Sequence, residues 1–347
     1  MVILKAENER SLIASILGAL GASERERHWV AEALTEADLR DHASHGLLRL
    51  PAMVRRIQQG GMRTGTRYRV RRQKGAALVV EGAGGLGPYV AAEAMGLAIE
   101  TARAHGVGCV GVVNSNHICM AGFYAELAAK ADLVGIVTTT TPSFVHPWGG
   151  VEALIGTNPL AVAIPSRGEP ILLDMATSLA SYGKVLEARK KGTPLGEGWA
   201  VGPAGLPTRN PEQAIAGALS PFGGHKGYGL GLVLGLLAGP LVGAAVGKKV
   251  VAAFSPTGAS TKGDLLLAID PSSFGEVAAF KERVSEFVRE VKSSPPAPGV
   301  REILLPGERS YRERERRLRD GIPIVEEVWG EVAAVARGLE VELPSTG

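Results

Sequence analysis

Short apolar runs separated by polar turns fill the middle of the chain and predict strands alternating with helices. The runs lie at residues 76–81, 107–113, 133–138, 160–164, 171–173 and 265–269. Residues 89–105 and 122–130 instead repeat their apolar side chains at helical spacing. Strands and helices that alternate in this way predict an α/β core.

Helical patterns dominate both ends of the chain. They cover residues 7–20, residues 23–39, a segment beginning near Ser44, residues 308–319 and a segment from about residue 326. Ser23 and Glu26 have the spacing of a capping box, which places a helix start there. A chain of 347 residues is long enough for two domains. We therefore predict a discontinuous helical domain, residues 1–74 plus 275–347, around an α/β domain, residues 75–274.

The second half of the chain contains two glycine-rich segments. Residues 192–203 are rich in Gly and Pro and predict a long loop. From 223 to 247 glycine recurs at every fourth position, and residues 229–247 carry no charge. One interpretation is a non-enzymatic membrane or packing protein built on this stripe of small residues. Pro240 interrupts the stripe, which favours a helix buried between domains or subunits and no membrane span.

Composition and charge narrow the classes of function. A formal net charge of +3 does not favour a nucleic-acid partner. Basic residues alternate along residues 66–74, which is more typical of a solvated edge strand than of an anion or nucleic-acid patch. The two cysteines, Cys109 and Cys119, are too few for a disulfide framework. With no evident signal peptide, we expect a cytoplasmic protein.

One glycine motif matches the dinucleotide-binding fingerprint. Gly82 opens the hexapeptide G-A-G-G-L-G, residues 82–87, which follows a predicted strand and begins a predicted helix. A Rossmann-type dehydrogenase that binds its cofactor here is therefore an alternative. Such a fold places an acidic residue at the end of the second strand, where this chain has Asn114. The missing acidic residue weakens this interpretation.

Two polar segments contain histidines that suit proton transfer. N-S-N-H ends at His117, just beyond a predicted strand, where a rigid sheet can hold a reactive group. S-H-G-L-L-R places His45 four residues before Arg49, a spacing that puts both on one face of a helix. An imidazole exchanges protons near neutral pH, and a guanidinium matches the two oxygens of a carboxylate. Ser44 could orient His45.

Further motifs complete a pattern that resembles a known family. In chain order they are S-H-G-x-x-R-x-P, N-x-N-H, P-W-G-G with G-T-N-P, D-M-A-T-S, G-W-A, G-G-H-K-G-Y-G-L and L-P-G-E-R. They extend from about residue 41 to residue 325. This ordered set resembles the malate/L-lactate dehydrogenases of the second, non-Rossmann type. That family includes sulfolactate, ureidoglycolate and 2,3-diketogulonate oxidoreductases.

The resemblance implies a fold, an activity and an assembly. The fold is α/β, with a non-Rossmann mixed-sheet cofactor domain and a discontinuous helical domain built from both termini. The activity is hydride transfer between NAD or NADP and a small 2-hydroxy or 2-oxo acid, such as malate or lactate. The assembly is a homodimer with a shared active site. On this basis residues 82–87 become a structural turn.

The resemblance also assigns the site residues. The cofactor contacts it implies are Asp174, Met175, Ala176, Thr177, Ser178, His225, Lys226, Gly307, Glu308 and Arg309. From their chemistry, Lys226 could hold a pyrophosphate at a helix start, and Thr177 and Ser178 could cap a helix. Arg49 suits the substrate carboxylate, while His45 and His117 both remain candidates for the proton donor. No spacing of histidine and cysteine suggests a metal site.

Three positions depart from the pattern of many family members. Cys119 stands where many carry glycine, and Gly235 stands where many carry an acidic residue. Residues 262–264, K-G-D, stand near the place where many carry asparagine-glycine-histidine. The last two departures put in doubt contacts that tune the substrate or the dimer packing.

Overall fold

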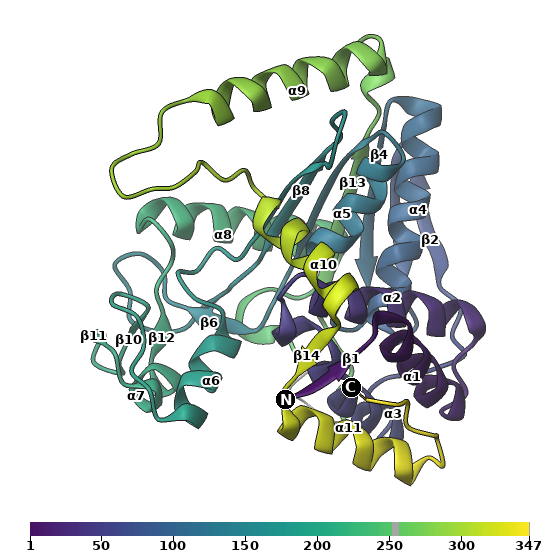
Figure 1. Cartoon of the computed structure of the whole chain (residues 1–347), viewed down its shortest axis with the longest axis vertical. Helices are drawn as coiled ribbons and strands as arrows, with labels where there is room; N and C mark the ends of the chain where they lie inside the picture. Colours follow the sequence, from purple (N-terminus) through teal and green to yellow (C-terminus); the bar gives the residue numbers. More distant parts are fainter. Residues whose placement is uncertain (252–256, 347) are drawn as a thin grey trace.

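A seven-stranded mixed sheet lies at the centre of the computed structural model, which describes residues 1–251 and 257–346 (Figure 1). In sheet order its strands are β2 (Arg69–Lys74), β3 (Ala77–Glu81), β4 (Val107–Val113), β13 (Gly263–Ile269), β5 (Val134–Thr139), β8 (Leu160–Ile164) and β9 (Ile171–Met175). Within this sheet β3 and β4 run parallel, and every other neighbouring pair is antiparallel. One parallel pair does not make a doubly wound sheet, so the predicted α/β fold with a non-Rossmann mixed sheet is confirmed.

All of the predicted strands are present. The strands predicted at 107–113 and 160–164 agree with β4 and β8 to the residue. β2 is exposed along its whole length at one edge of the sheet, as its alternating basic residues predicted. Charged side chains on such an edge oppose pairing with other chains.

The register of the sheet gathers the polar loops at one end of the strands. β3, β4, β5 and β9 all finish at this end, and β13 begins there. The residue pairs at this end are Glu81–Val113, Val113–Gly263, Thr139–Asp264, Thr138–Leu160 and Leu160–Met175. The loops that carry His117, Lys262 and the residues after Asp174 therefore leave the sheet side by side.

Helices cover both faces of the sheet. α4 (Gly87–His105) and α5 (Ala121–Lys130) pack on one face, and α8 (His225–Ala238) reaches β5 and β13. Glycines within the strands allow close packing, because a Cβ at Gly108 would lie 2.1 Å from the carbonyl oxygen of Ala98 in α4. At Gly135 it would lie 2.2 Å from the carbonyl oxygen of Ala125 in α5. The high glycine content is thus partly a packing requirement.

Segments from both chain ends pack together beside the sheet. β1 (Val2–Leu4) pairs with β14 (Ile322–Ile324), so the two ends of the chain lie close together (Figure 1). The helices of this region are α1 (Ala6–Ala19), α2 (Glu24–Leu39), α3 (Leu50–Gln58), α10 (Glu308–Asp320) and α11 (Glu326–Gly338). The capping box of Ser23 and Glu26 is present at the start of α2, as predicted. The predicted boundaries between the two domains, at residues 74/75 and 274/275, stay a prediction.

Two regions differ from the sequence-based expectation. The predicted loop at 192–203 belongs to a small lobe that follows α6 (Tyr182–Lys191) and contains α7 (Pro211–Ala216). Its five-stranded sheet consists of β11 (Pro207–Thr208), β10 (Ala200–Val201), β12 (Ala218–Leu219), β6 (Ser143–Val145) and β7 (Ile155–Gly156). Strands of two or three residues are too short to show periodicity, so the sequence did not predict this sheet.

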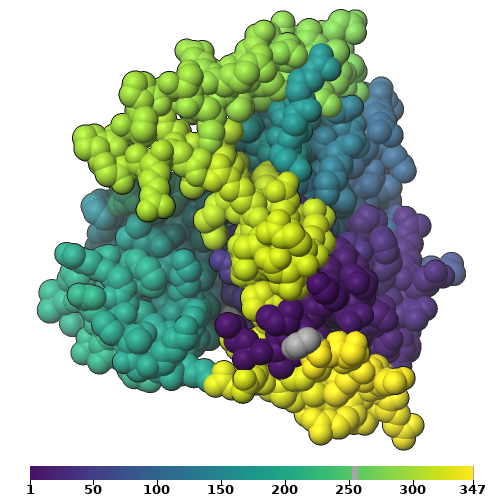
Figure 2. Space-filling view, in the orientation of Figure 1, coloured from purple at the N-terminus to yellow at the C-terminus, as the bar shows by residue number. Residues whose placement is uncertain are grey.

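The helix α9 (Val277–Ser293) was not predicted either. With the connector that follows it, α9 forms the light-green rim in Figure 2.

The glycine stripe packs within the chain. α8 ends at Ala238, before Pro240, and buries Gly231 and Gly235. A Cβ at Gly231 would lie 2.6 Å from Thr177 Oγ1, and one at Gly235 would lie 2.6 Å from Asn158 Nδ2. Across residues 1–251 and 257–346, no helix combines the length and apolar character needed to cross a bilayer.

Candidate active site

His45 and Arg49 lie on two tight turns at the end of α2. The predicted α-helix begins only at Leu50; the preceding residues form the 3₁₀ turns η1 (Ala43–His45) and η2 (Leu47–Arg49). Asp38 explains the difference, because its buried carboxylate accepts a hydrogen bond from the Leu47 backbone N–H at 2.5 Å. A Cβ at Gly46 would lie 2.1 Å from Asp38 Oδ2. Glycine therefore allows the turn to close against α2.

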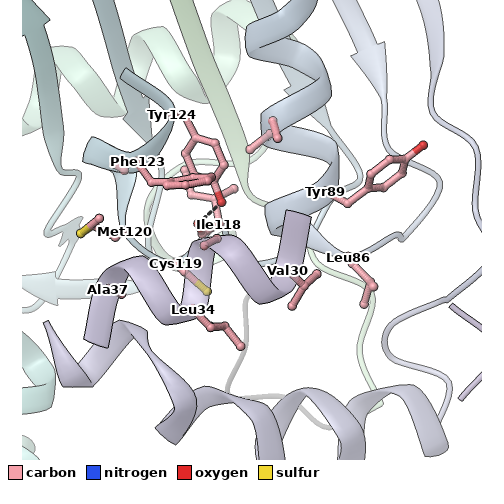
Figure 3. Close-up of a cluster of buried hydrophobic side chains, with 14 of the residues drawn as sticks. Val30, Leu34, Ala37, Leu86, Tyr89, Ile118, Cys119, Met120, Phe123 and Tyr124 are labelled. Atoms are coloured by element: carbon pink, nitrogen blue, oxygen red, sulfur yellow. Dashed lines mark hydrogen bonds between the residues drawn. The ribbon is translucent and has the colours of Figure 1, made fainter. Parts of the chain in front are cut away.

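The loop after β4 fixes the position of His117. Ile118, Cys119 and Met120 lie in the hydrophobic core between α2 and α5 (Figure 3). The Tyr124 hydroxyl donates to the Ile118 carbonyl oxygen at 2.6 Å. With three apolar neighbours buried in succession, the His117 backbone has little freedom to move.

The glycine motif at 82–87 supports this loop from the other side. Gly84 N–H donates to the Asn114 carbonyl at 2.8 Å, and Asn116 Nδ2 donates to the carbonyls of Gly84 and Gly85 at 2.9 Å. A Cβ at Gly87 would lie 2.2 Å from the His117 carbonyl oxygen. Protein groups therefore occupy the space that a pyrophosphate would need in a Rossmann fold, as expected of a structural turn.

The structure brings Ser44, His45, Arg49 and His117 together. The His45 and His117 rings have centroids 5.7 Å apart and planes inclined by 26°. Ser44 Oγ lies 2.8 Å from His45 Nδ1, and Arg49 Nε donates to the Ser44 carbonyl at 2.6 Å. Residues from a helix end and a strand end, 68 positions or more apart, thus form one cluster.

Burial keeps both imidazoles neutral. Burial, followed by the charges of Arg49 and His42, lowers the pKa of His45 to about 3. Burial, then Arg49, His45 and Lys262, holds the pKa of His117 well below its usual value. A substrate carboxylate next to Arg49 would oppose this effect, because an anion favours the protonated imidazole.

The two histidines differ in their hydrogen bonds. The Cys119 backbone N–H donates to His117 Nδ1 at 3.2 Å, so Nδ1 is an acceptor and the neutral ring carries its proton on Nε2. The Ser44 hydroxyl can donate to His45 Nδ1 or accept from it. His45 can therefore gain a proton and keep its hydrogen bond with Ser44. His117 would lose its hydrogen bond with the Cys119 N–H if its Nδ1 were protonated.

A polar cavity beside this cluster contains three of the expected cofactor residues. It has a volume of about 160 Å³, and its lining includes Asp174, Gly307 and Arg309 together with Arg40 and His42. Arg40 is buried and pairs with Glu36 and Glu126, but its Nη1 has no hydrogen-bond partner among the described residues. Since a buried donor without a partner is unfavourable, Nη1 fits a ligand oxygen such as that of a phosphate or a ribose.

Asp174 occupies the end of β9 in this cavity. Its Oδ2 accepts a hydrogen bond from the Gly122 N–H, at the start of α5, at 2.7 Å. Burial raises the pKa of Asp174 to about 6, although Gly122 and Arg40 act in the opposite direction. The carboxyl can thus hold a ligand hydroxyl either as acceptor or, at lower pH, as donor.

The rest of the D-M-A-T-S segment connects the cavity to α8. Met175 closes β9 opposite Leu160, and Ala176 follows it. Thr177 donates through Oγ1 to the Thr157 carbonyl at 2.9 Å, and Ser178 donates to the Ala180 carbonyl at 2.7 Å. The expectation that Thr177 or Ser178 caps a helix is wrong. Ser181 caps α6, because the chain needs three more residues to turn into that helix.

The remaining expected cofactor residues lie at the starts of two helices. His225 and Lys226 open α8 and are exposed, with the His225 ring 6.4 Å from that of Trp148. Glu308 opens α10, accepts from Lys292 Nζ at 2.8 and 2.9 Å and also pairs with Arg312. Its carboxylate is therefore engaged within the protein. Arg309 is largely exposed and pairs with Asp41 at 3.3 Å.

Sequence reasoning missed four residues of this region. They are Asp38, Arg40, His42 and Lys262, which come from α2, from the residues after it and from the approach to β13. His42 lies three residues before His45, a spacing that could have suggested a role. Lys262 was noted only as part of a departure from the family pattern at 262–264 and was given no role. Asp38 and Arg40 give no local signal, because charged residues at such positions are usually exposed.

Comparisons with known proteins find similar sequences and structures over nearly the whole chain. A model of the malate/L-lactate dehydrogenase family matches residues 4–333. A malate/(S)-sulfolactate dehydrogenase of Methanothermus fervidus is 41% identical over 342 residues, 99% of each chain. An NAD⁺-dependent ureidoglycolate dehydrogenase of Escherichia coli O157:H7 is 33% identical over 328 residues, 94% of this chain and 93% of the relative. The crystallised sulfolactate dehydrogenase of Methanocaldococcus jannaschii superposes with a TM-score of 0.93 at 38% identity, covering 99% of this chain and 98% of that one.

Proposed function

This chain belongs to the malate/L-lactate dehydrogenase family and is a 2-hydroxy acid dehydrogenase, and we propose that His45, His117 and Arg49 form its active site. The observation that carries the proposal is the convergence of these three groups: the two imidazoles are 5.7 Å apart, and the Arg49 charge acts on both. Reduction of a 2-oxo acid needs a carboxylate anchor and a proton donor beside the carbonyl oxygen.

Arg49 anchors the substrate carboxylate in this proposal. Its guanidinium is partly buried and hydrogen-bonds the Ser44 carbonyl at 2.6 Å, which fixes its orientation. Burial lowers the pKa of Arg49, and no carboxylate of the described residues forms an ion pair with it. An unpaired cation of this kind favours binding of an anion, and the planar fork sets the angle of the substrate.

His45 supplies the proton, and His117 holds the reacting oxygen. His117 Nε2–H donates a hydrogen bond to the carbonyl oxygen and stabilises the charge that develops on it. When C2 receives hydride, the protonated His45 gives its proton to that oxygen, and its Nδ1 keeps the bond to Ser44. In the reverse direction the neutral His45 removes the hydroxyl proton.

The cofactor lies against the cavity of Asp174, Gly307 and Arg309 in this proposal. Arg40 Nη1 and Arg309 would bind phosphate oxygens, and Asp174 would bind a ribose hydroxyl. NADH or NADPH supplies the hydride when bound there. The relatives' names, malate/(S)-sulfolactate and NAD⁺-dependent ureidoglycolate dehydrogenase, support malate-like acids as substrates and NAD or NADP as cofactor.

A substrate panel tests this function directly. Purified protein should oxidise NADH or NADPH with oxaloacetate, sulfopyruvate or pyruvate, measured as loss of nicotinamide absorbance. The pair with the highest kcat/KM defines the substrate and the cofactor. Absence of turnover with every 2-oxo acid and both cofactors, in protein that circular dichroism shows to be folded, would refute the proposal.

We further propose that the chain forms a homodimer through the outer face of α8. Opposite its buried glycines, α8 and the turn after it expose apolar side chains at Leu232, Val233, Leu236, Leu237 and Leu241, between 37% and 64% exposed. Contiguous apolar surface of this kind is typical of a subunit interface. Because α8 begins at His225 and Lys226, a partner there would lie beside two of the expected cofactor residues.

Replacement of Leu236 by Asp should produce a monomer, because a charge would be buried at the interface. Light scattering after size exclusion should show the mass falling by half. Leu206→Asp is the matched control, since Leu206 is 70% exposed in the small lobe, away from α8. The proposal would be contradicted if the wild-type protein were a monomer, or if the Leu236→Asp variant remained a dimer.

A further inference from the structure

Lys262 is a buried cation beside the proposed active site and has no assigned role. The side chain is 2% exposed and lies just before β13. The register pairs Gly263 with Val113, the last residue of β4, and His117 follows four residues later. The charge of Lys262 acts on both His117 and Cys119. The sheet therefore places a second cation, after Arg49, beside the loop that carries His117.

The ammonium of Lys262 has hydrogen-bonding capacity to spare. It donates to Asp264 Oδ1 and, at 3.4 Å, to Thr139 Oγ1. An ammonium has three N–H groups, so one of them has no acceptor among the described residues. Within residues 1–251 and 257–346, Asp264 Oδ2 is likewise buried without a partner. The ion pair thus leaves one donor of Lys262 unused.

We infer that Lys262 binds a second anionic group of the substrate and sets the preference for dianionic over monoanionic 2-hydroxy acids. With the C1 carboxylate on Arg49 and the hydroxyl between His45 and His117, the C3 substituent needs its own environment. A C4 carboxylate or a sulfonate would need a cation there, and a methyl group would not. Lys262 is the buried cation that the sheet register brings to the loop of His117. This inference rests on the proposed function.

Asp264 pairs with Lys262 in the free enzyme, and both side chains are buried. A merely structural ion pair would have the same partners. The two possibilities differ in what happens when Asp264 loses its charge but Lys262 keeps its own.

Three variants distinguish substrate binding from a structural role. In Lys262→Met, kcat/KM for oxaloacetate should fall roughly 10- to 100-fold, the usual effect of losing a hydrogen bond to a charged group. The value for pyruvate should change by less than about threefold, because its methyl group makes no ionic contact. In Asp264→Asn the preference for oxaloacetate over pyruvate should persist. In the double variant Lys262→Met/Asp264→Asn, which buries no unpaired charge, the preference should stay lost.

Two outcomes would overturn the inference. In the first, Lys262→Met lowers kcat/KM equally for oxaloacetate and pyruvate, and the double variant regains the wild-type values. This is the behaviour of a structural ion pair. The other is an unchanged ratio of the two kcat/KM values in the folded double variant. A wild-type enzyme inactive with every 2-oxo acid would instead overturn the proposed function, and this inference with it.

Discussion

His45→Asn should lower kcat by roughly 10²- to 10⁴-fold in both directions, which is the usual contribution of a positioned acid–base group. Asn has the size to fill the space but cannot exchange a proton at neutral pH. His117→Asn should cost about tenfold, because the amide can still donate a hydrogen bond to the carbonyl oxygen. This asymmetry follows from the acceptor role of His117 Nδ1 and the adaptable partner of His45, Ser44.

The pH dependence of the wild-type enzyme also tests the assignment of His45 as the proton donor. The pKa of His45 is about 3 in the free enzyme, so its ring is neutral near pH 7. Reduction needs the protonated ring, so kcat/KM for reduction, which reports the free enzyme, should fall as pH rises. Substrate bound to Arg49 raises the pKa of His45, so kcat for reduction should fall only at higher pH. Oxidation needs the neutral ring, and its kcat should rise through the same pKa.

Steady-state kinetics in both directions, across a pH series, check this assignment. His45→Asn should lose the pH-dependent limbs, and His117→Asn should keep them at reduced rate. His105→Asn is the matched control, because His105 is exposed at the end of α4 and should leave both profiles unchanged. If the pH dependence survives in His45→Asn and disappears in His117→Asn, the two roles are reversed.

Arg49→Lys should raise KM for the 2-oxo acid and lower kcat/KM roughly 100-fold, since loss of one charge-assisted contact costs about 2–3 kcal/mol. Lysine keeps the positive charge but cannot hold both carboxylate oxygens in one plane. The misplaced carbonyl should also lower kcat. The dissociation constant of the cofactor should stay near that of the wild type, because Arg49 does not line the cavity proposed for the cofactor.

Initial rates over a range of 2-oxo acid, with cofactor binding measured by nicotinamide fluorescence, separate these effects. Arg55→Lys is the control, because Arg55 is an exposed arginine on α3. A KM for the acid that matches the wild type would remove Arg49 from the carboxylate role. Weaker cofactor binding in Arg49→Lys would place Arg49 at the cofactor instead.

Local patterns were enough to predict most of the regular structure. The strands β4 and β8, the capping box of α2 and the exposed edge strand β2 all depend on residues close together in the sequence. The helix α9 also carried such a signal, because Val277, Phe280, Val284 and Phe287 repeat at helical spacing. The two-residue strands of the small lobe carried none, since their pairing is decided by distant segments.

The glycine motif at 82–87 shows where a local pattern is ambiguous. Strand, glycine turn and helix occur as the fingerprint requires, and β3 and β4 are even parallel. Asn116 and His117 nevertheless fill the space around the glycines. Glycines at this spacing can make room for either a cofactor or a second loop of the protein. The sequence alone does not say which of the two packs against them.

By itself, the sequence determined the order of the motifs, the family, and the chemical groups available: two imidazoles, a guanidinium and a polar segment after a strand. These depend on residue identity and short spacing. The tertiary structure alone decided that His45 and Arg49 lie on 3₁₀ turns closed against Asp38, that Nδ1 of His117 is an acceptor, and that Lys262 lies near His117. The first two features depend on which side chains the folded chain buries, and the third on a strand register that joins segments more than a hundred residues apart. No local pattern records which groups become buried or which segments meet.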